Sequence, residues 1–104
     1  MKIIWSPLAV DGVSEIAAYI AQENPDAAEN WVNTVFKKVE DLKSFPESGR
    51  IVPETKNKTI RELIYGNYRL IYRLEEKRIS VLTVRYGKQI LPVDEIKRND
   101  GVSP

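Results

Sequence analysis

The residues of this 104-residue chain best suited to chemistry are basic side chains between positions 60 and 88. Arg69 and Arg73 alternate with Ile71 in a stretch that reads as a central strand, where a charge is costly unless something binds it. A guanidinium is also the cation best shaped for two-pronged contact with a carboxylate or a phosphate. The candidate binding surface therefore comprises Arg61, Arg69, Arg73, Arg85, Tyr86 and Lys88.

A plainer interpretation of the same arginines stays open. They, together with Arg78, could pair with carboxylates of the chain itself or simply keep an open sheet face soluble. The acids available for such pairs are Glu62, Glu75, Glu76, Asp94 and Glu95.

The composition excludes several classes of site. There is no Cys and no His, so disulfides, thiolate metal sites and histidine-based catalysis are ruled out. The net charge of +1 lacks the large basic excess of a protein that lives on phosphate backbones. Helical carboxylates such as Glu15, Glu23, Glu29 and Glu40 are read as solvated. We therefore expect no metal, no cofactor and no catalytic residue.

Three strands and two tight turns must hold the basic residues, between Ile60 and Tyr86. Gly66-Asn67 forms the first turn, because both residue types tolerate positive φ, and residues 75–77 form the second. In the middle strand, alternation puts Tyr68, Leu70, Tyr72 and Leu74 on one face, and Arg69, Ile71 and Arg73 on the other. In the last strand it sets Ile79, Val81, Thr83 and Arg85 against Ser80, Leu82, Val84 and Tyr86.

Two helices precede these strands. Ser6-Pro7 follows a short apolar strand at residues 2–5 and is a cap followed by a first helical residue. Apolar residues then recur at helical spacing to about Gln22. Asn24-Pro25 repeats the start signal, and Phe45-Pro46 ends the second helix. Its apolar stripe is Ala28, Trp31 or Val32, Val35, Val39 and Leu42, widened by Phe36, and we expect Trp5, Trp31, Tyr65, Tyr68 and Tyr72 to serve the core.

The remaining segments complete a single domain over residues 1–104. Residues 47–59 are polar and predict an exposed loop. Residues 90–96 predict an irregular segment or a short helix packed against a sheet edge, which partly covers the second sheet face, and residues 97–104 predict a frayed tail. The fold class is α+β in the order βααβββ, with a helical hairpin packed on a mainly antiparallel four-stranded sheet. No run approaches a membrane span or a signal-peptide core, so we expect a cytoplasmic protein.

Several motifs together resemble the RelE/ParE toxin superfamily. They are Ser6-Pro7, Ala17-x-Tyr19-Ile20, Ala28-x-x-Trp31, Phe45-Pro46-x-x-Gly49-Arg50, Val52-Pro53-Glu54, the run from Ile60 to Arg73, and residues 84–89, and the match spans about residues 1–96. The resemblance implies the toxin half of a bacterial type II toxin–antitoxin module, often labelled a plasmid stabilisation protein, and the same βααβββ order.

The superfamily holds two activities, and the residues favour one. RelE-type toxins cleave messenger RNA on the ribosome with a basic cluster. Arg69 matches its hairpin arginine, but Ile60 and Glu62 stand at its lysine positions, and Gln89 and Glu95 at its C-terminal pair. Those are poor groups for offsetting phosphate charge. ParE-type toxins inhibit DNA gyrase and need only a docking surface, so the sequence favours a non-enzymatic gyrase inhibitor that arrests growth.

The resemblance also implies partners. A cognate antitoxin would wrap the toxin in a hetero-oligomer and bind operator DNA with its other end, so this chain would meet DNA only indirectly and no membrane. Two alternatives stay open. One is a RelE-like ribonuclease whose catalysts come from Arg69, Arg85, Tyr86, Lys56 and Lys58. The other is a silent member that binds antitoxin but poisons nothing.

Overall fold

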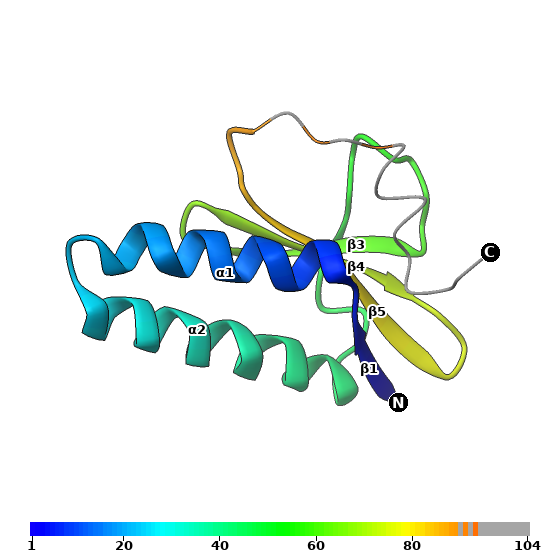
Figure 1. Cartoon of the computed structure of the whole chain (residues 1–104). Coiled ribbons are helices and arrows are strands. Elements are labelled where there is room, and N and C mark those ends of the chain that lie inside the picture. The colour runs from blue at the N-terminus through cyan, green and yellow to red at the C-terminus, as the bar shows by residue number, and fades with distance from the viewer. Residues whose placement is uncertain (90, 92, 94–104) are drawn as a thin grey trace.

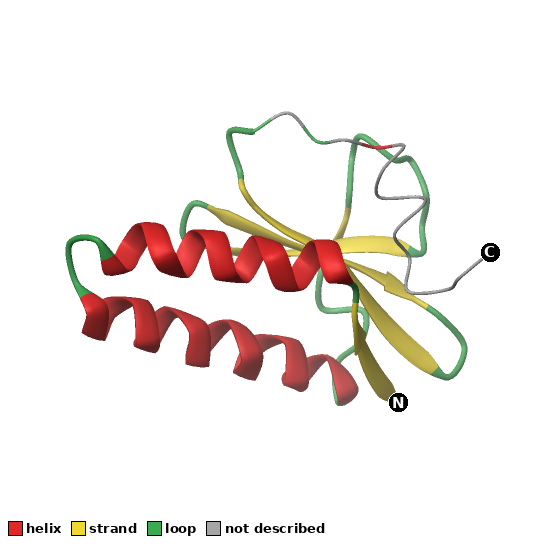
Figure 2. Ribbon diagram, viewed as in Figure 1, coloured by secondary structure: helices red, strands yellow, loops and turns green. Residues whose placement is uncertain are grey.

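Two antiparallel helices cover one face of a five-stranded sheet in the computed structural model, which describes residues 1–89, 91 and 93 (Figure 1). Figure 2 shows the same two layers by secondary structure. The elements are β1 (Lys2–Trp5), α1 (Pro7–Ala21), α2 (Pro25–Glu40), a 3₁₀ turn η1 (Asp41–Lys43), β2 (Arg50–Ile51), β3 (Ile60–Tyr65), β4 (Tyr68–Leu74) and β5 (Arg78–Tyr86).

Both helices begin at the residues that the predicted N-caps, Ser6 and Asn24, indicated. The Ser6 hydroxyl accepts from the amide of Ala9 (3.1 Å) and donates to the Leu82 carbonyl (2.8 Å), so this buried cap also ties α1 to β5. Asn24 Oδ1 accepts from the amide of Ala27 (3.0 Å). The predicted end of the second helix at Phe45-Pro46 is wrong, because α2 ends at Glu40 and the chain tightens into η1.

The sheet has the strand order β1-β5-β4-β3-β2. β1 pairs with β5 in parallel, and the other pairs are antiparallel. The predicted α+β class and the helical hairpin are confirmed, but the strand count of four is wrong. The fifth strand, β2, is a two-residue edge inside the predicted loop, and it pairs Arg50 with Glu62. In the Gly66-Asn67 turn only Gly66 takes a positive φ (59°).

A β-bulge in β5 overturns the predicted strict alternation of that strand. Ile71 pairs with Thr83, whereas Tyr72 pairs with Val81, so Leu82 is the extra residue. Val81 and Val84 consequently both pack with the helices, while Leu82 packs on the second face with Ile71. The bulge resets the phase of β5, which places Arg85 directly opposite Arg69.

Each sheet face has its own apolar cluster. The helical side holds the predicted stripe residues Trp31, Val35 and Val39 together with Leu70, whereas Phe36 is 45% exposed and lies against the Trp5 ring. The second face holds Val52, Ile60, Ile71, Leu82 and Leu91, with Val93 beside them. Most of the loop predicted at 47–59 is exposed, but Gly49 and Val52 within it are buried. Of the predicted C-terminal segments, all but residues 91 and 93 lie outside the described residues.

The loop before β2 is held by side chains from the sheet. The Tyr72 hydroxyl donates to the Pro46 carbonyl (2.8 Å) and accepts from the amide of Gly49 (3.1 Å). Arg61 Nη1 donates to the Gly49 carbonyl (2.9 Å). A Cβ at position 49 would lie 2.6 Å from the Tyr72 hydroxyl, so the loop fits closely over this ring.

Replacing Tyr72 with phenylalanine is expected to lower the free energy of unfolding by about 1–2 kcal/mol, because the buried Gly49 amide and Pro46 carbonyl both lose their partner. Urea denaturation measures the loss. Tyr19→Phe is the matched control, since the Tyr19 side chain is 71% exposed. Equal stability of Tyr72→Phe and the parent chain would contradict this role for the hydroxyl.

Candidate functional site

Three of the predicted arginines share the sheet face that the helices leave open. Arg69 and Arg73 lie on β4 on either side of Ile71, whose side chain is in the second-face cluster. Arg85 joins them because of the bulge, opposite Arg69. Two like charges that lie directly opposite each other on neighbouring strands destabilise the sheet unless carboxylates lie between or beside them.

Arg69 meets this requirement with two carboxylates of its own chain. Its Nε donates to Glu62 Oε1 (2.5 Å), and Nη1 and Nη2 donate to the two oxygens of Glu54 (2.8 and 3.0 Å). The other oxygen of Glu62 accepts from Arg50 Nε (2.7 Å). The four residues form a chain of alternating charge with no net charge, which we call the ion network.

Burial differs along the ion network. The Glu62 side chain is 0% exposed and that of Arg69 is 10% exposed, whereas Glu54 is 41% and Arg50 is 60% exposed. A buried carboxylate of this kind is stable only with its cations in place. The hydrogen bond from Arg69 lowers the pKa of Glu54 despite its partial burial, and the hydrogen bond from Glu54 raises the pKa of Arg69.

A fall in pH is therefore expected to weaken the ion network. The Glu54 carboxyl has a folded pKa below its ordinary value of 4.5, so its contribution is present above about pH 4.5 and is lost as the pH falls through the lower folded value. Glu54→Gln should be less stable than the parent chain in urea at pH 7, and the difference in the free energy of unfolding should shrink as the pH is lowered below 4.5. A difference that stays constant as the Glu54 carboxyl becomes protonated would contradict an ionic origin.

A second group of charges lies at the far end of β4. Arg78 Nε donates to Glu75 Oε2 (2.9 Å), and the Ser80 hydroxyl donates to the same carboxylate. Burial raises the pKa of Glu75, but the bonds from Arg78 and Ser80 and the charge of Arg73 more than offset it, so the net direction is down. The pairing that the sequence left open for these arginines thus occurs at Glu62 and at Glu75.

The remaining predicted residues fall in different places. Arg61 lies on the helical face of β3, where it holds the loop, and so is apart from the other arginines. The Tyr86 ring packs edge-on against Tyr68, with ring centroids 5.9 Å apart. Lys88 is exposed just beyond β5.

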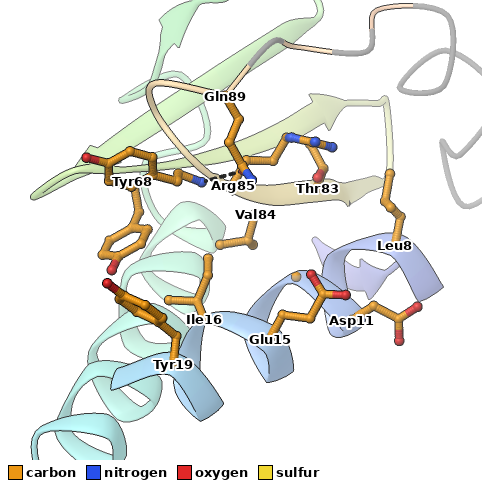
Figure 3. Close-up of a pocket in the computed structure, with 12 residues that line it drawn as sticks. Leu8, Asp11, Glu15, Ile16, Tyr19, Tyr68, Thr83, Val84, Arg85 and Gln89 are labelled. Carbon is orange, nitrogen blue, oxygen red and sulfur yellow. Dashed lines mark hydrogen bonds between the residues drawn. The ribbon is translucent and has the colours of Figure 1, made fainter. Parts of the chain in front are cut away.

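Two hollows adjoin this region. The larger, about 740 Å³, lies between α1 and β5. Figure 3 shows Asp11, Glu15 and Tyr19 on its α1 side, across from Arg85 and Gln89. The smaller, about 290 Å³, includes Arg50, Glu54, Arg69 and Lys88 among its lining residues. Three of those four side chains are cations, so the hollow is suited to bind an anion, and we call it the anion hollow.

Sequence reasoning missed two members of the ion network, Arg50 and Glu54. Both belong to motifs that carried the family resemblance, Gly49-Arg50 and Val52-Pro53-Glu54, and that association was their only signal. Their pairing with Glu62 and Arg69 depends on the β2–β3 register, which no local pattern shows.

The charged side chains of this region are bound mainly to one another. Among residues 1–89, 91 and 93, no three His, Cys, Asp or Glu side chains are placed to hold a metal ion. Within the same part of the chain, neither helix has the length and apolar character needed to cross a membrane. Arg69, the best-placed cation, already uses Nε and both Nη atoms on carboxylates.

Comparison with known proteins decides the family. The family model described as "ParE toxin of type II toxin-antitoxin system, parDE" matches residues 3–91. The chain belongs to the ParE toxin family. A Sinorhizobium fredii (strain NBRC 101917 / NGR234) protein named "Putative toxin Y4kP" is 33% identical to this ParE-family chain over 93 residues, which cover 88% of the chain and 93% of that protein.

A solved structure shares the ParE-type fold. It is titled "Chromosomal ParDE TA system from P. aeruginosa" and aligns with a TM-score of 0.67 at 20% identity. The alignment covers 83% of this chain and 95% of the other. At this identity the likeness concerns the fold, and it agrees with the helical hairpin on a mainly antiparallel sheet described above.

Proposed function

We propose that this ParE-family toxin is a non-enzymatic inhibitor of DNA gyrase that a cognate antitoxin neutralises. The observation that carries the proposal is the match of the ParE toxin model to nearly the whole described chain. A toxin that works by docking needs a surface and no reactive group, in keeping with a site made of arginines, tyrosines and ion pairs. Because gyrase acts on chromosomal DNA, the site of action would be the cytoplasm.

The ion network favours this proposal over messenger RNA cleavage. A RelE-type ribonuclease would need Arg69 to face a phosphate in the transition state, but the buried Glu62 binds its Nε and offsets its charge. The two positions where that chemistry needs lysines hold Ile60 and Glu62, and both are buried. Neither side chain can offset phosphate charge.

The antitoxin would bind the open face and its edges. Of the predicted binding residues, Arg69, Arg73 and Arg85 share that face and Lys88 follows its last strand, whereas Tyr86 lies on the helical face against Tyr68. Operator DNA would be reached only through the antitoxin, in a hetero-oligomer. Co-purification of the chain with the product of its neighbouring gene tests this part, and failure to form a complex between two folded proteins would contradict it.

The gyrase proposal is tested by titrating the purified, antitoxin-free chain into a gyrase supercoiling assay. We expect supercoiling to fall and detergent with protease to reveal trapped DNA breaks. Arg85→Gln and Lys88→Gln should weaken inhibition, and Lys77→Gln, an exposed cation at the opposite end of β4, is the matched control. Unaffected gyrase would overturn the proposal.

Two further experiments separate the alternative functions. Toeprinting of translating ribosomes would reveal cleavage at the A site if the chain were a RelE-like ribonuclease. Expression without the antitoxin would leave growth unchanged if it were a silent member. Growth arrest with intact messenger RNA and poisoned gyrase is the expected result.

A further inference from the structure

The anion hollow contains more positive than negative charge. Arg50, Arg69 and Lys88 line it with one carboxylate, Glu54, and the buried Glu62 lies behind the two arginines. Three positive and two negative side chains leave one positive charge in excess. Ile64, 51% exposed, adds an apolar wall.

Glu62 is the fixed anion of this hollow. It stands in β3 between β2 and β4, is wholly buried, and binds the Nε atoms of Arg50 and Arg69 with its two oxygens. Those bonds hold both guanidinium groups in position. The Arg50 side chain makes no other hydrogen bond to the described residues, so its two Nη groups can take a further acceptor.

The end of β5 fixes Lys88 on the opposite rim. The amide of Gly87 donates to the Asn67 carbonyl (2.7 Å), which ties the chain after β5 to the β3–β4 turn. A Cβ at position 87 would lie 3.1 Å from that carbonyl and 3.6 Å from Cγ of Arg69. The close fit keeps the next residue, Lys88, beside the Arg69 side chain.

Glu54, by contrast, can be exchanged. It lies in the loop between β2 and β3, outside any strand, and 41% of its side chain is exposed. Two residues later Lys56 has a φ of 51°, a left-handed conformation that is unfavourable for a residue with a Cβ. A rotation of the Glu54 side chain alone would break only its two hydrogen bonds to Arg69, and the loop would keep the buried Val52 in place.

We propose that Glu54 occupies a carboxylate-binding site in the free toxin, and that a carboxylate of the antitoxin displaces it from Arg69. The incoming group would take the Nη atoms of Arg69, with Arg50 and Lys88 adding charge, while Glu62 keeps both arginines in place. A protein carboxylate fits better than a nucleic-acid phosphate, because the excess charge of the hollow is small and because the group that now binds both Nη atoms of Arg69 is itself a carboxylate. The source of the carboxylate rests on the proposed function.

The first test uses hexaglutamate as a carboxylate probe, followed by NMR chemical shifts of the folded chain at low salt. Removing an internal competitor raises apparent affinity by the inverse of the open fraction. Glu54→Gln should therefore bind the probe roughly tenfold more tightly than the parent chain, if about a tenth of molecules are open. Lys88→Gln should bind about threefold more weakly by loss of one near charge, and Lys77→Gln should be unchanged.

Two results of this test would overturn the site. One is a folded Glu54→Gln chain that binds hexaglutamate no better than the parent. The other is a gain confined to a single-stranded DNA oligonucleotide, which would make the hollow a phosphate site. Circular dichroism confirms that each variant is folded.

The second test identifies the source, by calorimetric titration with the purified antitoxin. We expect the same order of affinities, with Glu54→Gln tightest and Lys88→Gln weakest. If the variants differ toward hexaglutamate but not toward the antitoxin, the antitoxin is not the source. If the antitoxin binds no variant, that part of the proposed function fails, whereas the hexaglutamate result still decides the site.

Discussion

Replacing Glu62 with alanine is expected to lower the free energy of unfolding by about 3–5 kcal/mol, the usual effect of breaking a buried ion pair by removing one partner. The side chain is fully buried and joins Arg50 to Arg69. Without it, Arg69 keeps only Glu54 as a counter-charge, and a void opens between β2 and β4. Because domains of this size are stable by only about 5–15 kcal/mol, a large part of the total stability would be lost.

Urea denaturation measures the effect of Glu62→Ala, with Glu76→Ala as the matched control in the exposed turn after β4. A double variant, Glu62→Leu with Arg69→Leu, isolates the cause. If the cost comes from an uncompensated charge, the double variant should be more stable than Glu62→Leu alone by at least about 2 kcal/mol. A single-variant loss under about 1 kcal/mol would show that the network does not hold the sheet together.

The second large effect is expected at Gly12, where α1 crosses β5. A Cβ at this position would lie 2.3 Å from the carbonyl oxygen of Val84 and 3.3 Å from its carbonyl carbon. These are backbone atoms that cannot rotate away, so α1 has to move off the strand. Overpacking of this kind costs about 1–3 kcal/mol or more, and we expect Gly12→Ala to lose about 3 kcal/mol.

The sign of the Gly12→Ala result is itself a sharp test. Helix propensity alone would make this substitution stabilising by about 1 kcal/mol, whereas the close packing makes it destabilising. Ser14→Ala, exposed on the same helix, is the control and should change little. A more stable Gly12→Ala chain would mean that α1 does not lie against Val84 as closely as described.

The elements of this fold follow from local sequence because local physics decides them. The side chains of Ser6 and Asn24 accept hydrogen bonds from amides that the first turn of a helix leaves without partners, and both caps form as predicted. Pro7 and Pro25 have no amide hydrogen that would need a partner there. Alternation in β4 likewise separates Leu70 from Ile71 and Arg69 in a single strand. The α+β class and the order of the elements other than β2 and η1 needed nothing more.

The candidate site could be predicted only in part from the sequence, because its contacts join residues that are far apart in the chain. The sequence singled out Arg69 as a costly charge that something must bind, but Glu54, 15 residues earlier, is one of its partners. That contact exists because β2 pairs with β3 and carries the next loop over the sheet, which is a long-range event. The two-residue β2 has too short a pattern to be seen.

By itself, then, the sequence determined where both helices and every strand except β2 begin, which residues could form a core, and which family motifs are present. Only the tertiary structure decided that Arg85 shares the face of Arg69 and Arg73 and that Arg61 lies on the helical face. One extra residue at Leu82 turned Arg85 toward Arg69, and strand register brought Arg50 and Glu54 to the same site. Capping and periodicity act over a few residues, whereas a bulge or a buried charge pair is set by the balance of packing and desolvation across the whole sheet.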